Sequence, residues 1–155
     1  PPGNRLAGET MNIKVMQVAP GDVVAMWPVV GELLQKAYDA DPVGCADTSL
    51  DQLKALLVAG VQRLLIAVRD EASIVCACTV APVYYPNASV AFVTAAGGQF
   101  GTDERVQEAF RNWAKHSGFT RIQAQVRPSV ARLASRRGYR EIGRIVDFDL
   151  GKVQV

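Results

Sequence analysis

The sequence has few residues that could hold a metal ion or build a disulfide framework. It contains one histidine, and its three cysteines are Cys45, Cys76 and Cys78. Cys76 and Cys78 lie two positions apart in an apolar, strand-like run, a spacing too tight for the usual C-x-x-C site. We therefore expect no metal and interpret the cysteines as small buried side chains in a reducing compartment, which predicts a cytoplasmic protein.

Long apolar runs are also missing. No run approaches the roughly 20 residues that cross a bilayer, and no basic-then-apolar leader opens the chain, so we expect neither export nor a membrane partner. Residues 1–10 are polar and aperiodic, which predicts a disordered extension. Residues 11–155 are then predicted to form a single domain, because a chain of 155 residues suits one core.

Charge is modest overall but unevenly placed. The net charge is +2, and the hydrophobic fraction of 49% is ordinary for a globular protein. One stretch is crowded with arginines, opposed only by Glu141: Arg121, Arg127, Arg132, Arg136, Arg137, Arg140 and Arg144. They could form a solvated surface or a phosphate-binding surface for a coenzyme or a nucleic acid. We do not expect nucleic acid to be the partner.

Hydrophobic periodicity predicts alternating strands and helices. Strands are expected at residues 11–17, 64–69, 74–83, 89–94, 121–127 and 141–150, and helices at residues 22–38, 49–59, 102–116 and 128–137. Pro28 should end the first turn of its helix or kink it. Ser49 and Gln52 resemble a capping box, and Pro128 suits the first position of a short helix.

The predicted order is β-α-α-β-β-β-α-β-α-β. Three consecutive strands favour an antiparallel portion, and the later β-α-β stretch favours a parallel pair. The sequence thus predicts a mixed α+β fold, a six- to seven-stranded sheet with helices on both faces. The glycine-rich loop and the helix after it should open a V-shaped gap between strands 89–94 and 121–127.

This order, with the tail R-P-S-V-A-R-L-A-S-R-R-G-Y from Arg127 to Tyr139, resembles the GCN5-related N-acetyltransferase (GNAT) superfamily. Gly138-Tyr139 matches the Gly-aromatic pair that opens a late strand in that family. The chain is also loosely similar to small GNAT-like proteins of bacteriophages. The resemblance implies acetyl-coenzyme A as cofactor and an amine of a small molecule or protein as acceptor.

The resemblance also implies where the coenzyme binds. It assigns Phe92, Val93 and Thr94 to the strand that pairs with the pantetheine amides. It assigns the loop residues Gly98, Gln99, Gly101 and Thr102 to the pyrophosphate, at the N-terminus of the following helix. No catalytic residue is assigned.

Two positions depart from the family pattern. Asp103 stands where the family has a small residue, and its carboxylate would use the helix N–H groups that a pyrophosphate needs. The alternative interpretation is that Thr102 caps the helix while Asp103 complements its dipole. Ala134 occupies the position of a general-acid tyrosine and cannot donate a proton. Two hypotheses follow: an acyl-coenzyme A-dependent N-acyltransferase, or an inactive GNAT-like module that binds a protein or nucleic acid.

Overall fold

The computed structural model describes residues 12–41, 47–100 and 102–151. The predicted extension at residues 1–10, Met11, Cys45 and Gly101 lie outside the described residues. The chain divides into two compact units, one ending at Gln125 and the other beginning at Val126. In the described residues, no helix is both long and apolar enough to cross a membrane.

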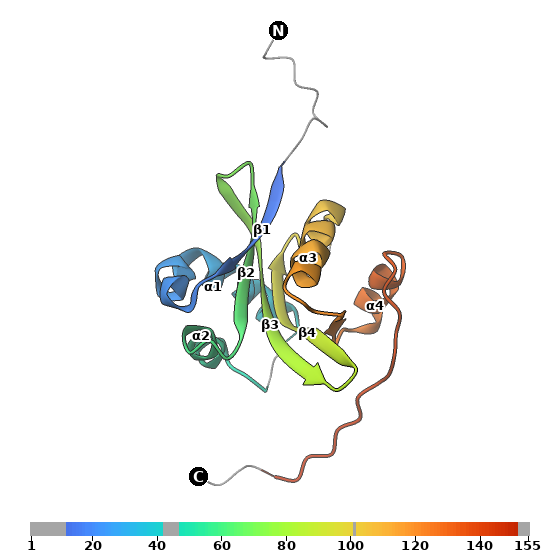
Figure 1. The fold of residues 1–155 in the computed structure, drawn as a ribbon. Helices are drawn as coiled ribbons and strands as arrows, with labels where there is room; N and C mark the ends of the chain where they lie inside the picture. The colour runs from blue at the N-terminus through green and yellow to red at the C-terminus, as the bar shows by residue number, and fades with distance from the viewer. Residues whose placement is uncertain (1–11, 42–46, 101, 152–155) are drawn as a thin grey trace. The chain divides into compact units, whose positions relative to one another are not determined.

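The first unit contains one mixed sheet in the order β1-β2-β3-β4-β5 (Figure 1). Its strands are β1 (Ile13–Val18), β2 (Arg63–Arg69), β3 (Ser73–Tyr85), β4 (Ala88–Gly98) and β5 (Arg121–Ala124). The pairs from β1 to β4 are antiparallel, and β4 pairs with β5 in parallel. The predicted mixed α+β class, with an antiparallel portion and one parallel pair, is confirmed.

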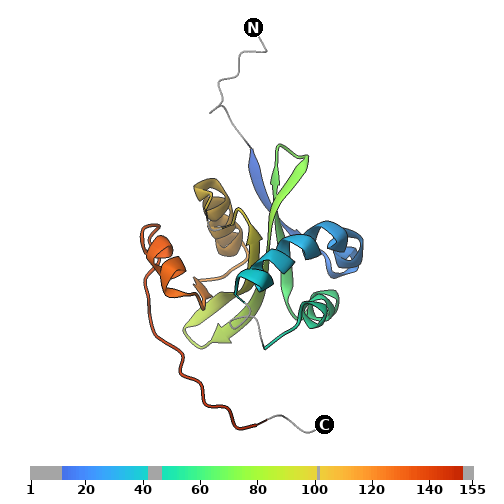
Figure 2. The same ribbon diagram turned by 180° about the vertical axis from the view of Figure 1, so that it is seen from behind.

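Helices cover both faces of this sheet, as predicted (Figures 1 and 2). On one face, α1 (Val23–Ala40) and α2 (Leu50–Val58) pack onto the sheet through Leu34, Leu53 and Leu57. We call the cluster of buried side chains between these helices and the sheet the α1/α2 core. On the other face, α3 (Glu104–His116) packs onto the sheet through Phe110 and Ala114. We call the cluster of buried side chains between α3 and the sheet the α3 core. The two cores are separated by the sheet, since alternate residues of each strand face opposite sides.

Local signals explain where these helices begin and end. Ser49 accepts a hydrogen bond from Gln52 N–H at 3.1 Å, and the Gln52 side chain accepts one from Ser49 N–H at 2.8 Å, so the predicted capping box is confirmed. Because α1 continues through Pro28, the prediction that this residue ends the first turn was wrong, and the alternative, a kink, stays a prediction. Pro28 lacks the N–H that would bond to the carbonyl of Val24, and Val24 is exposed, so water can satisfy that carbonyl.

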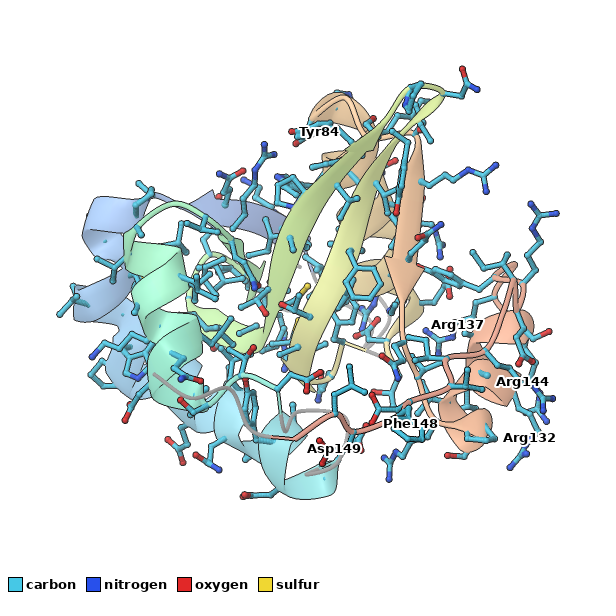
Figure 3. The ribbon with its side chains drawn as sticks, turned by 90° about the horizontal axis from the view of Figure 1, so that it is seen from below. Tyr84, Arg132, Arg137, Arg144, Phe148 and Asp149 are labelled. Atoms are coloured by element: carbon cyan, nitrogen blue, oxygen red, sulfur yellow. The ribbon has the colours of Figure 1, made fainter. Side chains whose placement is uncertain are left out.

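The second unit contains α4 (Pro128–Ser135), with Pro128 in the first turn as predicted. Gly138 follows in the left-handed region at φ 90°, where Tyr139 N–H donates to the carbonyl of Ala134 at 3.1 Å. Figure 3 labels Arg132 on α4 and Arg137 on the turn after it, and Arg144, Phe148 and Asp149 on the segment that follows.

The predicted strand at residues 141–150 was wrong, since this segment forms no ladder and is described as irregular chain. The described sheet therefore has five strands instead of six or seven. The alternation of Val146, Phe148 and Leu150 has the right period, but these side chains are 95%, 83% and 92% exposed. A strand needs a neighbour for its backbone hydrogen bonds, and period alone does not supply one.

Candidate functional site

The middle of β4 contains a β-bulge at Thr94. Thr79 of β3 pairs with Ala95 and Val80 pairs with Val93, so Thr94 is the extra residue on β4. A bulge shifts the alternation of side chains by one position. Val93 packs in the α3 core before the bulge, and Ala95 packs in the α1/α2 core after it.

Pairing with β5 stops at the same point. The parallel ladder runs from Val90 with Arg121 to Val93 with Ala124, and no described pair follows it. Phe92 and Val93 therefore lie inside the ladder, whereas the β4 backbone from Thr94 to Gly98 is paired with β3 alone. β5 itself ends at Ala124, so the predicted divergence of residues 89–94 and 121–127 stays a prediction. One edge of β4 is left available for hydrogen bonds to an extended ligand.

A polar trio of Gln62, Thr79 and Thr94 lies beside the bulge. The Thr94 hydroxyl donates to Gln62 Oε1 at 2.6 Å, and the Thr79 and Thr94 hydroxyl oxygens are 2.6 Å apart. Either hydroxyl can donate in the contact between Thr79 and Thr94, and the Thr94 hydroxyl also lies 3.2 Å from the carbonyl oxygen of Thr79. Thr79 is 0% exposed, so this chain of hydrogen bonds satisfies a fully buried hydroxyl. The trio ties the bulge to the turn before β2.

Two adjacent glycines end β4, and packing requires both. At Gly97 an added Cβ would lie 1.9 Å from the carbonyl oxygen of Leu33 in α1. Gly98 has φ 86°, and its added Cβ would lie 2.4 Å from the carbonyl oxygen of Val75. Helix packing and chain reversal therefore account for these glycines without a ligand.

The loop after β4 is held by its own hydrogen bonds. Thr102 and Asp103 N–H both donate to the carbonyl of Gln99, at 3.3 and 3.2 Å, and Gln99 N–H donates to that of Val75 at 3.3 Å. The buried Gln107 side chain donates from Nε2 to the carbonyl of Phe100 at 2.6 Å. The Gln99 and Thr102 backbones, both assigned to the coenzyme phosphates from the sequence, are thus engaged within the protein.

Asp103 is the N-cap of α3, so the prediction that Thr102 caps this helix was wrong. Asp103 Oδ1 accepts from Arg105 N–H at 2.9 Å, and both carboxylate oxygens also pair with the Arg105 guanidinium at 3.3 and 3.2 Å. The hydrogen bond from the Arg105 side chain lowers the pKa of Asp103. A carboxylate therefore occupies the positive end of the helix, where an anionic ligand would otherwise bind.

The two described cysteines are buried in the sheet and do not act as nucleophiles. Cys76 and Cys78 are each 1% exposed, as predicted for small apolar side chains. Burial raises the pKa of the Cys76 thiol to about 11 and that of the Cys78 thiol well above its usual range. Both remain protonated at neutral pH, and a thiol is a poor nucleophile.

Several solved structures share this arrangement over nearly the whole chain. A predicted acetyltransferase from Clostridium acetobutylicum with acetyl-CoA has a TM-score of 0.56 at 11% identity, covering 90% of this chain and 97% of the other. An aminoglycoside N-acetyltransferase, AAC(6')-Iy, in complex with CoA has a TM-score of 0.59 at 15% identity, covering 93% and 98%. An aminoglycoside acetyltransferase from an uncultured soil sample, in complex with sisomicin, has a TM-score of 0.59 at 15% identity, covering 90% and 96%.

This chain has the GNAT fold. No family model matches the sequence, and no curated protein is detectably similar to it. The likeness therefore lies in the arrangement of strands and helices.

The position that the sequence resemblance assigns to the family's general-acid tyrosine lies on α4. It is Ala134, whose methyl side chain has no proton to donate. The neighbouring Ser135 is the last residue of α4 and is exposed.

Sequence reasoning missed the residues around the bulge. Gln62 is 32 residues away from Thr94, and nothing in the local pattern links the two. The unpaired edge also extends to Ala95 and Ala96, beyond the predicted strand end at Thr94. A polar Thr79 within an apolar strand was the available signal, because a buried hydroxyl requires a partner.

Proposed function

We propose that the chain is an acyl-coenzyme A-dependent N-acyltransferase that transfers an acetyl group to a primary amine of a small molecule or protein. The observation that carries the proposal is the bulge at Thr94 together with the end of the β5 ladder. These leave the second half of β4 with a free edge in a fold shared with acetyltransferases that bind acetyl-CoA and CoA. The reducing environment expected for buried thiols suits a cytoplasmic enzyme.

The free edge fits the pantetheine arm of the coenzyme. Pantetheine is an extended chain with two amides, and such a chain can add to an open strand edge as a peptide does. Of the predicted strand residues Phe92, Val93 and Thr94, the first two pair with β5, so we propose that this contact begins at Thr94 and continues along the free edge to Gly98. The loop residues Gly98, Gln99, Gly101 and Thr102 would lie along the remainder of the coenzyme.

The bound coenzyme supplies an activated acyl thioester, and the protein supplies position. Holding an amine and a thioester in reacting geometry lowers the barrier even without a proton donor. This matters here because Ala134 has no acidic proton and we assign no catalytic residue. An amine that arrives deprotonated meets this requirement.

The amine class is proposed from the acceptors of proteins with the same fold. One neighbour is an aminoglycoside acetyltransferase in complex with sisomicin, an amine-bearing ligand. Sisomicin and simple primary amines are therefore the first acceptors to test. Formation of an amide releases free coenzyme thiol, which a thiol-reactive dye reports continuously.

Hydrogen exchange with and without acetyl-CoA tests where the coenzyme binds. We expect amides within 94–98 to gain protection, because new hydrogen bonds form along the free edge. β1 is the other edge strand of the sheet and serves as the control, with no gain expected at Ile13–Val18. Absence of binding at millimolar acetyl-CoA would rule out the enzyme.

A binding module is the second candidate, favoured by two observations. Asp103 closes the N-terminus of α3 with its own carboxylate, and Ala134 provides no acid. A domain that has lost catalysis would retain the fold while lacking both an open helix N-terminus for the phosphates and a general acid. Failure of acetyl-CoA to raise the melting temperature, with a rise on adding a protein or nucleic-acid partner, supports this alternative.

A further inference from the structure

The start of α3 has little capacity left for a phosphate group. Four N–H groups in and after the loop already donate within the protein: those of Gln99, Thr102, Asp103 and Arg105. Each would have to break its present hydrogen bond to serve a pyrophosphate. An exchange of one acceptor for another brings little net gain, because the protein acceptor is then left unsatisfied.

The charges at this helix end also oppose an anion. Asp103 and Glu104 bring two negative charges to the first turn, and the nearby arginines are already paired with them. Arg105 contacts Asp103 at 3.2 Å, and Arg111 contacts Glu104 at 2.6 Å. The Asp103 side chain is 18% exposed, so solvent screens its charge only partly. A phosphate group at this helix end would be repelled by two carboxylates, and the two arginines that could attract it are already paired with those carboxylates.

The free edge of β4 carries no such obstacle. From Thr94 to Gly98 its backbone pairs with β3 alone, and the neighbouring trio is internally satisfied and uncharged. A neutral ligand with two amides suits this edge, and its affinity does not depend on phosphates. The β4 half of the expected coenzyme site is therefore neutral and has open backbone groups. The half at the start of α3 is negatively charged, and its N–H groups already donate within the protein.

We propose that this chain recognises its acyl donor through the neutral pantetheine arm, with no favourable contribution from the pyrophosphate at α3. This inference rests on the proposed function. The ligand class is an acyl thioester of pantetheine, of which acyl-CoA is one source and a phosphopantetheine arm attached to a carrier protein is another. Asp103 is the residue that sets this preference.

Calorimetric titration with three donors tests the proposal: acetyl-CoA, acetyl-4'-phosphopantetheine and acetyl-pantetheine. We expect the three dissociation constants to agree within about threefold, since the phosphates add nothing. Raising the salt concentration should leave the affinity for acetyl-pantetheine unchanged. It should not weaken the binding of acetyl-CoA, because no attraction between the phosphates and the protein is there to be screened. Tighter binding of acetyl-CoA by more than about tenfold would overturn the proposal while leaving the enzyme function standing.

The same titration on Asp103 variants identifies the cause. Asp103→Gly releases the Arg105 N–H and guanidinium, so acetyl-CoA should bind about fivefold tighter while acetyl-pantetheine is unchanged. Asp103→Asn keeps a capping side chain, removes the charge and guards against unfolding; it should give a smaller gain in the same direction. Asp51→Gly, which removes the first-turn acid of α2, is the matched control and should leave the ratio unchanged.

Each outcome decides the matter. If no donor binds, the proposed function fails and the inference falls with it. If acetyl-4'-phosphopantetheine alone binds tightest, a single phosphate is recognised and the inference is wrong. If the ratio of acetyl-CoA to acetyl-pantetheine affinity does not change in Asp103→Gly, Asp103 does not set the preference.

Discussion

Two segments of this chain share the same alternation, and one of them is a strand. In β5, Ile122 and Ala124 alternate with Arg121 and Gln123, and the segment pairs with β4 along its length. In residues 141–150, Val146, Phe148 and Leu150 alternate with Asp147 and Asp149 in the same way, yet no ladder forms. Alternation permits a strand on either segment, and a neighbouring strand with free hydrogen-bonding groups decides which one forms.

The comparison predicts that substitutions act strongly in the partnered sheet and weakly in the unpartnered segment. The largest effect is expected at glycines. Gly97→Ala should cost about 3 kcal/mol or more, because the new Cβ would lie 1.9 Å from the Leu33 carbonyl oxygen. Gly143→Ala has nothing within 4 Å of its new Cβ and should change stability by less than about 0.5 kcal/mol. Urea unfolding of both variants measures the difference, and equal losses would break the comparison.

A charge on the apolar face should separate the two segments next. Ile122→Asp should lower the free energy of unfolding by about 2–3 kcal/mol, since Ile122 packs against the α3 core. Phe148→Asp replaces a side chain that is 83% exposed and should have an effect under about 0.5 kcal/mol. Thermal and urea unfolding test this. A large loss in Phe148→Asp would mean that residues 141–150 are packed in solution.

A buried polar group provides a third test of the comparison. The paired strands contain the buried hydroxyl of Thr79, whereas the described side chains of residues 141–150 are exposed. Thr94→Val should cost about 1–3 kcal/mol by leaving the Thr79 hydroxyl without its partner. Thr79→Val combined with Thr94→Val should regain part of that loss, since no unsatisfied hydroxyl remains. Asp149→Ala removes an exposed hydrogen bond to Gly151 N–H and should be nearly neutral. A strictly additive double variant would show that the trio is not coupled.

The smallest effect is expected at the helix that follows β4. Asp103→Ala should cost about 1 kcal/mol at neutral pH by removing the N-cap of α3. Arg105 lowers the pKa of Asp103, so the carboxylate stabilises the fold fully above its unfolded pKa and loses that effect as pH falls through the folded value. The difference in free energy of unfolding between the unchanged protein and Asp103→Ala should therefore be constant from neutral pH down to about pH 5, and it should disappear at lower pH. A gap that widens with acid would contradict this assignment.

Local signals in the sequence predicted most of the first unit. The capping box at Ser49 and the apolar runs of β2, β3 and β4 were each visible in a few consecutive residues. These features depend on backbone chemistry within one or two turns, so a single sequence reveals them. The GNAT-like order of elements followed from their succession.

The candidate site was predicted less completely, because its key features are contacts between distant segments. The bulge at Thr94 is a matter of register between β3 and β4, and the hydrogen bond from Thr94 to Gln62 joins residues that lie 32 positions apart. The N-cap of α3 was assigned one residue early, at Thr102, although Asp103 is an equally good cap by type. Which of two adjacent capping residues acts depends on how the loop leaves β4.

By itself, the sequence determined the class of fold, the succession of elements as far as α4 and the capping box of α2, since these follow from periodicity and short-range hydrogen bonds. Tertiary structure alone decided three further features. Residues 121–124 find a partner strand and residues 141–150 do not, β4 loses its neighbour after Val93, and Gly97 is required by the approach of α1. Each depends on the distance between segments far apart in the chain, a quantity that no local pattern of residues contains.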